Sequence, residues 1–479
     1  RKCCGWARSF ARVTILFYIV VLLEIRLKLI PSSGDGVAFI ATGRAPRKSK
    51  MVLCRAGDGS FGWCTYDAEA LPHTVALRNG SRDFADIPIF NAHDIPNHVQ
   101  DDPSWRSRPF ILRGDSSVVA LQEQFSRDSL VDLAKRERLR TRIGHSWSIT
   151  KNGGEGPEEV DLSEYIETVM HRTWYDGETA LEPAYAFDPS SKVPGLPDNV
   201  HPWISSWDKT AFELPANAIR IMLLGSAGSA IGWHKHGAAV QTTIHGCKRW
   251  FLYPPGTRPP GEGSDGGSSI TDWLSIVYPS IRAENAPLEF IQVAGDTVYI
   301  PEGWYHAVIN LADTVGSSIQ QRRWENEVFH GITVADVEQL RVNHPEQLSN
   351  LMVGAQEHMQ SNPGDNLDAR RALFYGLCDA YHEQALDIML EGILQDPFQV
   401  TLQYELSKWL WWLASGGDEY ALQMFRGLAH EWRPYLEQNV RSTKALWILS
   451  TYFASVQDEG QLDYCNRRMS ELNQRGIAR

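Results

Sequence analysis

Residues 232–237 read Gly-Trp-His-Lys-His-Gly and place one lysine between His234 and His236. Side chains two residues apart on a β-strand point to the same face, so this spacing predicts two neighbouring imidazoles. A third histidine, His306, follows in residues 301–310, PEGWYHAVIN. Imidazole is a ligand for Fe, Zn, Cu and Ni. The three histidines are therefore candidate metal ligands, although a His-x-His pair by itself is also compatible with packed or surface histidines.

The sequence around these histidines favours β-structure. From Ala218 to Gln320, short runs rich in β-branched and aromatic residues, such as AIRIMLLG, VQTTIHG and LEFIQVAGD, alternate with Gly- and Pro-containing turns. Many short strands with such punctuation are typical of an all-β sandwich or barrel. Residues 254–269, PPGTRPPGEGSDGGSS, form a loop insertion within this region.

Three further motifs follow the first histidine pair in a fixed order: GCKRWFLYPP at 246–255, GDTVYIP at 295–301 and WYHAVIN at 304–310. Together with RPFILRG at 108–114, this set resembles the JmjC (jumonji C) family of Fe(II)- and 2-oxoglutarate-dependent oxygenases. The resemblance covers about Arg108 to Gln320. It implies an all-β double-stranded β-helix, a cupin-like jelly-roll core. The residue pattern outside this core adds N-terminal helices and an all-α C-terminal region.

The resemblance assigns roles to individual residues. His234 falls on the family's first metal ligand, His306 on the last, and His236 on the position where the family has a carboxylate. Lys248 falls on the lysine that pairs with the far carboxylate of 2-oxoglutarate in many relatives, although an ordinary lysine at a strand end remains an alternative.

Two further residues are candidates for binding the cosubstrate. Strand alternation counted through residues 242–248 predicts that Thr242 shares a face with Lys248. Gln320 falls near a polar family position on the last strand of the core. Ile231 stands where family members often have a threonine, and Asn310 is expected to satisfy backbone groups rather than bind cosubstrate.

Replacing the carboxylate ligand by His236 changes the charge of the site. Two histidines and one carboxylate leave Fe(II) with a formal charge near +1, whereas three neutral imidazoles leave it near +2. The extra charge attracts an anionic oxoacid, but the ligand set then has no anion to stabilise higher oxidation states of iron. Affinity for Zn, Ni or Cu is expected to rise, and each imidazole must be neutral to bind a metal.

Two functions are therefore in competition. The first is an Fe(II)- and 2-oxoglutarate-dependent oxygenase that hydroxylates a protein side chain, with Fe²⁺ and 2-oxoglutarate as cofactors. The second is a non-catalytic JmjC-fold scaffold or binding protein with a protein partner. The missing carboxylate and Ile231 favour the scaffold, and the retained Lys248 favours the oxygenase.

Composition argues against one class of partner, although a local basic patch remains an alternative. The chain of 479 residues has a formal net charge of -12 and 43% hydrophobic residues. That hydrophobic fraction is ordinary for a folded protein. An acidic chain is a poor general binder of nucleic acid, because phosphate contacts require a basic surface. A nucleic-acid partner is not expected.

The N-terminal residues 1–30 are expected to be a signal peptide or signal anchor. Basic residues precede the apolar run Val13–Leu23, which has the length of a signal-peptide core and is short for a membrane span. As an uncleaved anchor it would attach the chain to a membrane. Asn79 begins a glycosylation sequon, and Cys54 and Cys64 would either form a disulfide in an oxidising lumen or remain free thiols. Within the JmjC family, these features and the His-x-His variant most resemble the small JmjC protein of the animal endoplasmic-reticulum lumen, which predicts a secretory location.

The remaining chain divides by composition. Residues 31–105 form a loop-rich lead-in, 106–325 the JmjC domain and 330–479 a helical region. In the helical region, Ala385-Leu386 before Asp396-Pro397 and Ala421-Leu422 before Pro434 hint at tetratricopeptide-like helix pairs. A helical bundle packed on the β-domain is an equally good interpretation.

Overall fold

The structure, a computed structural model, describes residues 60–64, 85–146, 158–172, 174–176, 179–188, 193–262, 269–322, 329, 332–378, 382–439 and 442–474. The residues outside these ranges include the apolar run at 13–23, Cys54 and the sequon at Asn79, so the predictions for them lie outside the described part of the chain. Within the described ranges, no helix is long and apolar enough to cross a membrane.

The larger of two main β-sheets has nine strands in the order β1-β2-β13-β10-β15-β8-β7-β3-β4. Apart from the parallel pair β1·β2, neighbouring strands are antiparallel. The strands span Ile89–Asn91 (β1), Phe110–Arg113 (β2), Arg140–Gly144 (β3), Glu158–Asp161 (β4), Tyr185–Asp188 (β7), Ala218–Gly225 (β8), Ala239–His245 (β10), Thr297–Ile300 (β13) and Thr314–Gln321 (β15).

The smaller sheet has four antiparallel strands in the order β12-β11-β14-β9. They span Ala230–His234 (β9), Cys247–Tyr253 (β11), Leu288–Val293 (β12) and Tyr305–Asn310 (β14). A separate two-stranded sheet pairs Trp174–Asp176 (β5) with Thr179–Leu181 (β6).

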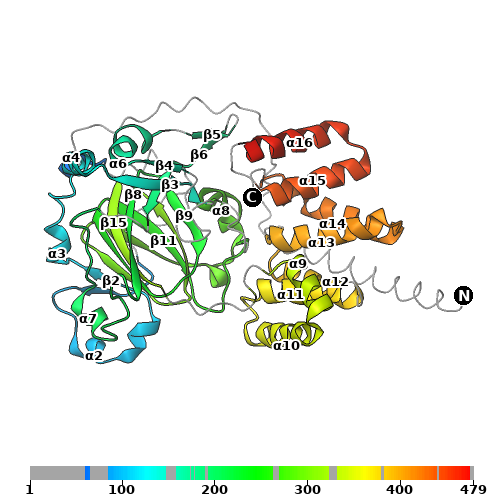
Figure 1. Cartoon of the computed structure of the whole chain (residues 1–479), viewed down its shortest axis with the longest axis horizontal. Helices are drawn as coiled ribbons and strands as arrows, with labels where there is room; N and C mark the ends of the chain where they lie inside the picture. Colours follow the sequence, from blue (N-terminus) through cyan, green and yellow to red (C-terminus); the bar gives the residue numbers. More distant parts are fainter. Residues whose placement is uncertain are drawn as a thin grey trace, which may run out of the picture.

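The two main sheets face one another (Figure 1). Residues of both sheets line a small cavity between them. From β8 to β15 the chain changes sheet at every connection except β11 to β12, which is consistent with the predicted double-stranded β-helix. One change of sheet is made by Gly246 alone, between β10 and β11. Its φ is +82°, and a Cβ there would lie 2.1 Å from the carbonyl oxygen of Asp313, so only glycine fits.

Short helices cover the outer faces of the sheets. Helix α4 packs through Leu130 and Ala134 into a cluster on the large sheet, and α8 packs through Trp273 on the small sheet. The short helices are Ser60–Gly62 (η1), Asn97–Gln100 (α2), Pro103–Ser107 (η2), Ser116–Val119 (α3), Arg127–Glu137 (α4), Leu162–Glu164 (α6), Tyr165–Val169 (η3), Pro202–Ser205 (α7), Ile270–Ile276 (α8), Tyr278–Ser280 (η4) and Ala283–Asn285 (η5).

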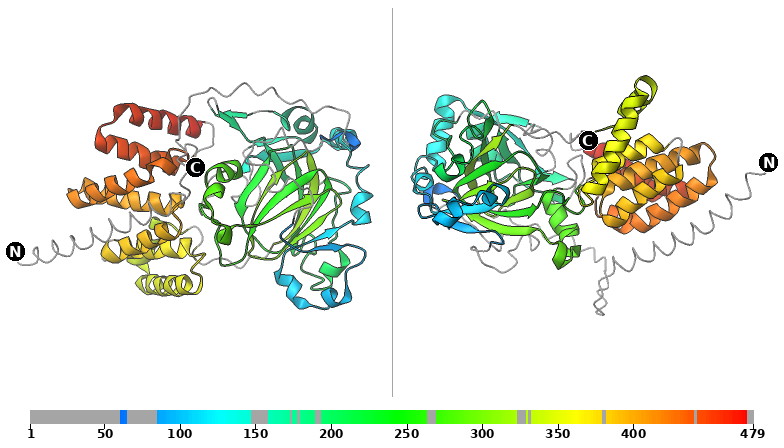
Figure 2. Two further views of the ribbon diagram at one scale, coloured as in Figure 1. Left: turned by 180° about the vertical axis from the view of Figure 1, so that it is seen from behind. Right: turned by 90° about the horizontal axis from the view of Figure 1, so that it is seen from below.

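In the described residues, the named elements of the C-terminal region are all helices, as predicted. Consecutive helices pack on one another in a row beside the barrel (Figures 1 and 2). Pro434, part of the spacing that suggested helix pairs, lies inside α14 near its end. The helices are Val334–Asn343 (α9), Pro345–Ser361 (α10), Leu367–Leu377 (α11), His382–Gln395 (α12), Val400–Ser415 (α13), Glu419–Leu436 (α14), Thr443–Val456 (α15) and Glu459–Gln474 (α16).

Candidate metal centre

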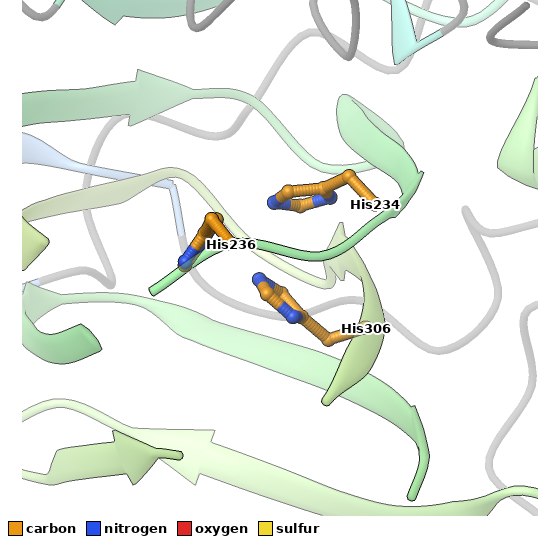
Figure 3. Close-up of side chains that lie close together, drawn as sticks. All are labelled: His234, His236 and His306. Carbon is orange, nitrogen blue, oxygen red and sulfur yellow. The ribbon is translucent and has the colours of Figure 1, made fainter. Parts of the chain in front are cut away.

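Three histidines from two strands and one loop lie close together (Figure 3) and line the cavity. His234 ends β9 and stands opposite His306 of β14 in the sheet register. The ring centroids of His234 and His306 are 4.1 Å apart, and that of His236 lies 5.3 Å from the first and 4.7 Å from the second. The histidines that the sequence singled out are thus brought together, although residues 236 and 306 are far apart in the chain.

The His-x-His pair is not arranged in the way that strand alternation predicts. Strand β9 ends at His234, so His236 lies in the loop that follows and is not held by the β9–β14 ladder. The backbone oxygen of His236 instead accepts a hydrogen bond from the N–H of Gly303, at 3.0 Å. The position of His236 therefore depends on contacts outside the sheet.

A register irregularity turns His234 inward. His306 pairs with His234 and Val308 with Ile231, so three steps along β9 match two steps along β14. An extra residue of this kind is a β-bulge, which re-aims the side chains that follow it. Both Ile231 and His234 line the cavity as a result, while Trp233 packs on the outer side against α8.

Each of the three imidazoles has one ring nitrogen fixed by a backbone carbonyl. Nδ1 of His234 lies 2.8 Å from the oxygen of Gly232, and Nδ1 of His306 lies 2.9 Å from the oxygen of Trp304. Nδ1 of His236 lies 2.7 Å from the oxygen of Gly237. A carbonyl only accepts hydrogen bonds, so in a neutral ring the hydrogen is on Nδ1 and Nε2 keeps its lone pair. A metal-binding histidine is oriented in this way.

The buried surroundings favour the neutral form of all three imidazoles. Burial, followed by the neighbouring His236, lowers the pKa of His234 to about 3. Burial lowers the pKa of His236, and burial together with the other two rings lowers the pKa of His306 well below its usual value. Nε2 of His236 is buried and has no hydrogen-bond partner. Neutral imidazoles with available Nε2 atoms fit a divalent transition metal such as Fe, Zn, Cu or Ni.

The cavity beside the histidines is small and mostly apolar. Its volume is about 20 Å³, room for roughly one water molecule. Small-molecule sites usually measure roughly 300–1,000 Å³. The structure as it stands therefore does not hold 2-oxoglutarate in this cavity. The walls are formed by Phe187, Leu223, Ile231, His234, His236, Ala239, Gln241, Trp250, Ile300, His306, Val308, Ser318 and Gln320.

Lys248 lies deeper in the barrel and does not line the cavity. It is fully buried, and its Nζ donates to the hydroxyl of Tyr185 at 2.8 Å and to Oδ1 of Asn310 at 3.0 Å. Both partners are neutral, and burial lowers the pKa of Lys248 to about 7. Along β11, Lys248 is four residues from Leu252, which pairs with His306, so the two levels are about 13 Å apart. The polar group that would hold a carboxylate is present, but apolar side chains lie between it and the histidines.

Gln320 lies in the cavity wall, but Thr242 does not. On β10 the inward positions are Ala239 and Gln241, and the hydroxyl of Thr242 instead contacts that of Thr297, at 3.2 Å, on the opposite face. The prediction that Thr242 shares a face with Lys248 is wrong, because Gly246 ends β10 and the chain enters another sheet before Lys248. Alternation cannot be counted through that turn.

Several inward polar groups were not predicted from the sequence. Tyr185 and Asn310 are the partners of Lys248, whereas Asn310 was expected to serve backbone groups. Thr243 alternates with Thr242 and thus points inward near the Gly246 turn; its buried hydroxyl has no hydrogen-bond partner. Recognising Gly246 as a corner between sheets would have identified Thr243 and Gln241, but no local signal marks Tyr185.

A second group of metal-binding residue types lies elsewhere in the fold: Cys64, His171 and Asp313. Here Nε2 of His171 lies 2.9 and 3.0 Å from the two carboxylate oxygens of Asp313, and the backbone N–H of Cys64 donates to the same carboxylate at 3.0 Å. Cys64 is disulfide-bonded. Its sulfur is therefore not a thiolate ligand.

Comparison with known proteins identifies relatives of the β-domain. A model of the cupin-like domain family matches residues 100–328. "JmjC domain-containing protein 8" of Rattus norvegicus is 28% identical over 213 residues, which are 43% of this chain and 72% of that protein. The β-domain of this chain is therefore similar to proteins of the JmjC family. The resemblance to that family found in the motifs is confirmed.

Other JmjC relatives carry enzymatic names. "Arginine-specific demethylase JMJ22" of Arabidopsis thaliana is 32% identical over 176 residues, 33% of this chain and 34% of that protein. "2-oxoglutarate and iron-dependent oxygenase JMJD4" of Gallus gallus is 32% identical over 122 residues, 24% of this chain and 28% of that protein. This chain thus spans about a third or less of the length of these two relatives.

Proposed function

We propose that this chain is a metal-dependent JmjC oxygenase that acts on a protein side chain. The observation that carries the proposal is the convergence of His234, His236 and His306, each with Nδ1 bound to a backbone carbonyl and Nε2 left to a metal. Fe(II) is the proposed ion, because relatives that bear the same domain include a 2-oxoglutarate and iron-dependent oxygenase. The metal would supply the chemistry of oxygen activation, and the three histidines would hold the metal in place.

Lys248 supports 2-oxoglutarate as the cosubstrate. A buried ammonium whose partners are only the neutral Tyr185 and Asn310 gains from a carboxylate, which would supply the opposite charge. The unpartnered hydroxyl of Thr243 offers a further hydrogen bond at the same end of the barrel. Three neutral imidazoles leave the metal with a higher positive charge than a site with a carboxylate, and this charge favours an anionic ligand.

The volume of the cavity supports a second candidate, a metal-binding scaffold without turnover. Phe187, Leu223 and Ile231 form an apolar wall, and the free space of about 20 Å³ is too small for 2-oxoglutarate. For the oxygenase, these side chains must move aside when the cosubstrate binds. For the scaffold, they remain in place and the metal is structural.

Anaerobic spectroscopy separates the two candidates. The oxygenase requires that 2-oxoglutarate added to the Fe(II)-loaded protein produce a visible metal-to-ligand charge-transfer band, and that oxygen then yield succinate. His306→Ala, which removes one proposed ligand, must lose both signals. Tight metal binding with no band and no succinate would establish the scaffold instead, and absence of metal binding would end both.

His236→Asp is the complementary probe. It restores the carboxylate that other family members have, so an oxygenase pocket that is intact apart from this ligand should gain succinate formation with Fe(II). If His236→Asp binds Fe(II) but shows no charge-transfer band with 2-oxoglutarate, the apolar wall rather than the ligand set closes the pocket.

We also propose a lumenal location in the secretory pathway, with the N-terminal segment as a signal peptide or anchor. The disulfide at Cys64 supports this, since such bonds persist in oxidising compartments. The expected result is protease protection of the chain in sealed microsomes, together with a glycosidase-sensitive mass shift that Asn79→Gln removes. Full digestion in the absence of detergent would place the chain outside the lumen.

A further inference from the structure

Lys235, the residue between two of the histidines, reaches out of the barrel to the C-terminal helical region. Its Nζ donates to Oδ2 of Asp365 at 2.8 Å and lies 4.6 Å from the ring centroid of Tyr305. Asp365 lies in the loop between α10 and α11. The segment that carries His234 and His236 is thereby tied to a different part of the fold.

The carboxylate of Asp365 also contacts Tyr305, the chain neighbour of His306. Tyr305 directly precedes His306, and its hydroxyl donates to Oδ1 of Asp365 at 3.1 Å. Nε of Arg258 donates to that oxygen too, also at 3.1 Å. One carboxylate of the helical region therefore contacts a chain neighbour of every histidine in the candidate metal centre.

The loop that carries Asp365 is itself fixed against the barrel. The backbone N–H of Arg258 donates to the oxygen of Gly364 at 2.8 Å, in an isolated β-bridge between Thr257 and Gly364. A Cβ on Gly364 would lie 2.5 Å from the oxygen of Gly256, so the approach requires glycine. Nε2 of His358 also lies 3.2 Å from the backbone oxygen of Asp365. The carboxylate is thus presented by a rigid segment.

Burial makes this contact more than a surface ion pair. The side chains of Lys235 and Asp365 are only 13% and 10% exposed. Exposed ion pairs contribute little, whereas removing one partner of a buried pair is costly because the other charge stays buried. Burial raises the pKa of Asp365, but Arg258 and Lys235 outweigh it and lower that pKa overall, so the group is ionised at neutral pH.

The contact falls where the β-ladder stops holding the site. Since β9 ends at His234, the backbone at Lys235 and His236 has no ladder partner on β14. The Lys235–Asp365 pair and the Gly303–His236 hydrogen bond take over there. Another carboxylate at the same domain interface, Asp396, accepts instead from the backbone N–H groups of Gly261 and Phe398. Asp396 thus binds backbone groups of the interface itself, whereas Asp365 contacts the segments that carry the histidines.

We propose that Asp365 is a positioning residue for the metal centre, so that metal binding in the barrel and docking of the helical region are thermodynamically linked. The inference rests on the proposed metal site and goes beyond it by making the helical region part of that site. Asp365 acts through Lys235 and Tyr305 and does not touch the metal. Ordering all three imidazoles before metal arrives reduces the conformational freedom that binding must remove.

The test is a Co(II) titration of the full chain, followed by its visible absorption in competition with a chelator. Asp365→Asn keeps the shape of the side chain but removes its charge, and it should weaken metal binding about tenfold, the lower end of the range for residues behind metal ligands. Asp396→Asn is the matched control and should bind Co(II) as wild type does. Tyr305→Phe, which loses only one hydroxyl, gives a folded second variant with a smaller loss in the same direction.

Two further readouts separate positioning from a merely structural role. In a Lys235→Met background, Asp365→Asn should weaken Co(II) binding by clearly less than the tenfold expected in the wild type, because the Lys235 contact is already lost and only the Tyr305 contact remains. Hydrogen exchange of a peptide covering residues 358–367 should slow on metal addition in the wild type and not in Asp365→Asn, since linkage is reciprocal. A structural role alone would lower the melting temperature of Asp365→Asn without changing either readout.

The outcomes are distinguishable from those of the proposed function. If wild type binds Co(II) and Asp365→Asn binds it equally well, the inference is overturned and the metal site stands. If wild type binds no metal, the proposed function and the inference both fail. Equal weakening by Asp365→Asn and Asp396→Asn would show that general loosening of the domain interface, and not Asp365, controls the site.

Discussion

Two groups of metal-binding residue types lie in this fold, and they differ in whether their donor atoms are free. In the histidine group, Nδ1 of each ring is bound to a carbonyl and Nε2 is left over. In the Cys64 group, Nε2 of His171 is bound to Asp313, and Cys64 is in a disulfide. Both groups bring three donors within 4.8 Å. Proximity alone does not make a metal site, because a donor that is already paired must first lose its partner.

The surroundings of the two groups reinforce this difference. His306 is 4% exposed in an apolar cavity, whereas the side chain of His171 is 39% exposed beside a buried carboxylate. A neutral imidazole in an apolar cavity has little to interact with except a metal. In the second group, the imidazole of His171 already has the carboxylate of Asp313 as its partner. This contact connects the segment after η3 to the residue before β15. We interpret the first group as functional and the second as structural.

The largest expected effect comes from removing a free donor. His306→Ala should weaken Co(II) or Fe(II) binding at least about a hundredfold, because the ion loses one of three protein ligands. His171→Ala, the matched change in the other group, should leave the dissociation constant unchanged. Calorimetric titration of both variants checks this, and a comparable loss in His171→Ala would reverse the assignment of the two groups.

Lys248 extends the comparison to a buried cation with only neutral partners. Lys248→Met should leave metal binding intact but weaken 2-oxoglutarate binding by roughly a hundredfold, since the carboxylate loses its buried opposite charge. The charge-transfer band of the Fe(II) protein measures this directly. A band of unchanged affinity in Lys248→Met would mean that another group holds the cosubstrate.

The pKa of Lys248 predicts a pH dependence of cosubstrate binding. Burial lowers that pKa to about 7 in the free protein, so below pH 7 the ammonium is already present and above it a proton must be taken up on binding. The affinity for 2-oxoglutarate should therefore fall about tenfold per pH unit above pH 7 and level off below it. Titrations at pH 6.5, 7.5 and 8.5 test this; a constant dissociation constant over that range would contradict it.

The smallest effect is expected in the structural group. Asp313→Asn removes the charge that His171 and the backbone N–H of Cys64 share, and should lower the free energy of unfolding by about 1–2 kcal/mol. Metal affinity should not change. Urea denaturation with and without Co(II) gives both quantities, and a loss of metal affinity equal to that of His306→Ala would show that the groups are coupled.

The part of the site that was predictable lies on ordered motifs. His234, His236, His306 and Lys248 were identified because their spacing to Gly, Trp and Pro residues follows a family pattern, and Gln320 does lie in the cavity wall. The prediction for Thr242 was wrong by one position, because strand alternation was counted through Gly246. This glycine is the corner at which the chain leaves the large sheet and enters the small one. The two-residue alternation of side chains does not continue through a corner between two strands.

The amino-acid sequence by itself determined the JmjC core, the helical C-terminal region and the identity of the candidate ligands, because strand patterning and motif order are local properties of the chain. Tertiary structure decided the rest. The bulge that turns His234 inward, the small apolar cavity and the Lys235–Asp365 contact, which joins residues 130 positions apart, depend on how separate segments pack. No local period encodes a contact between two such segments, since each residue's partner is fixed only when both have folded.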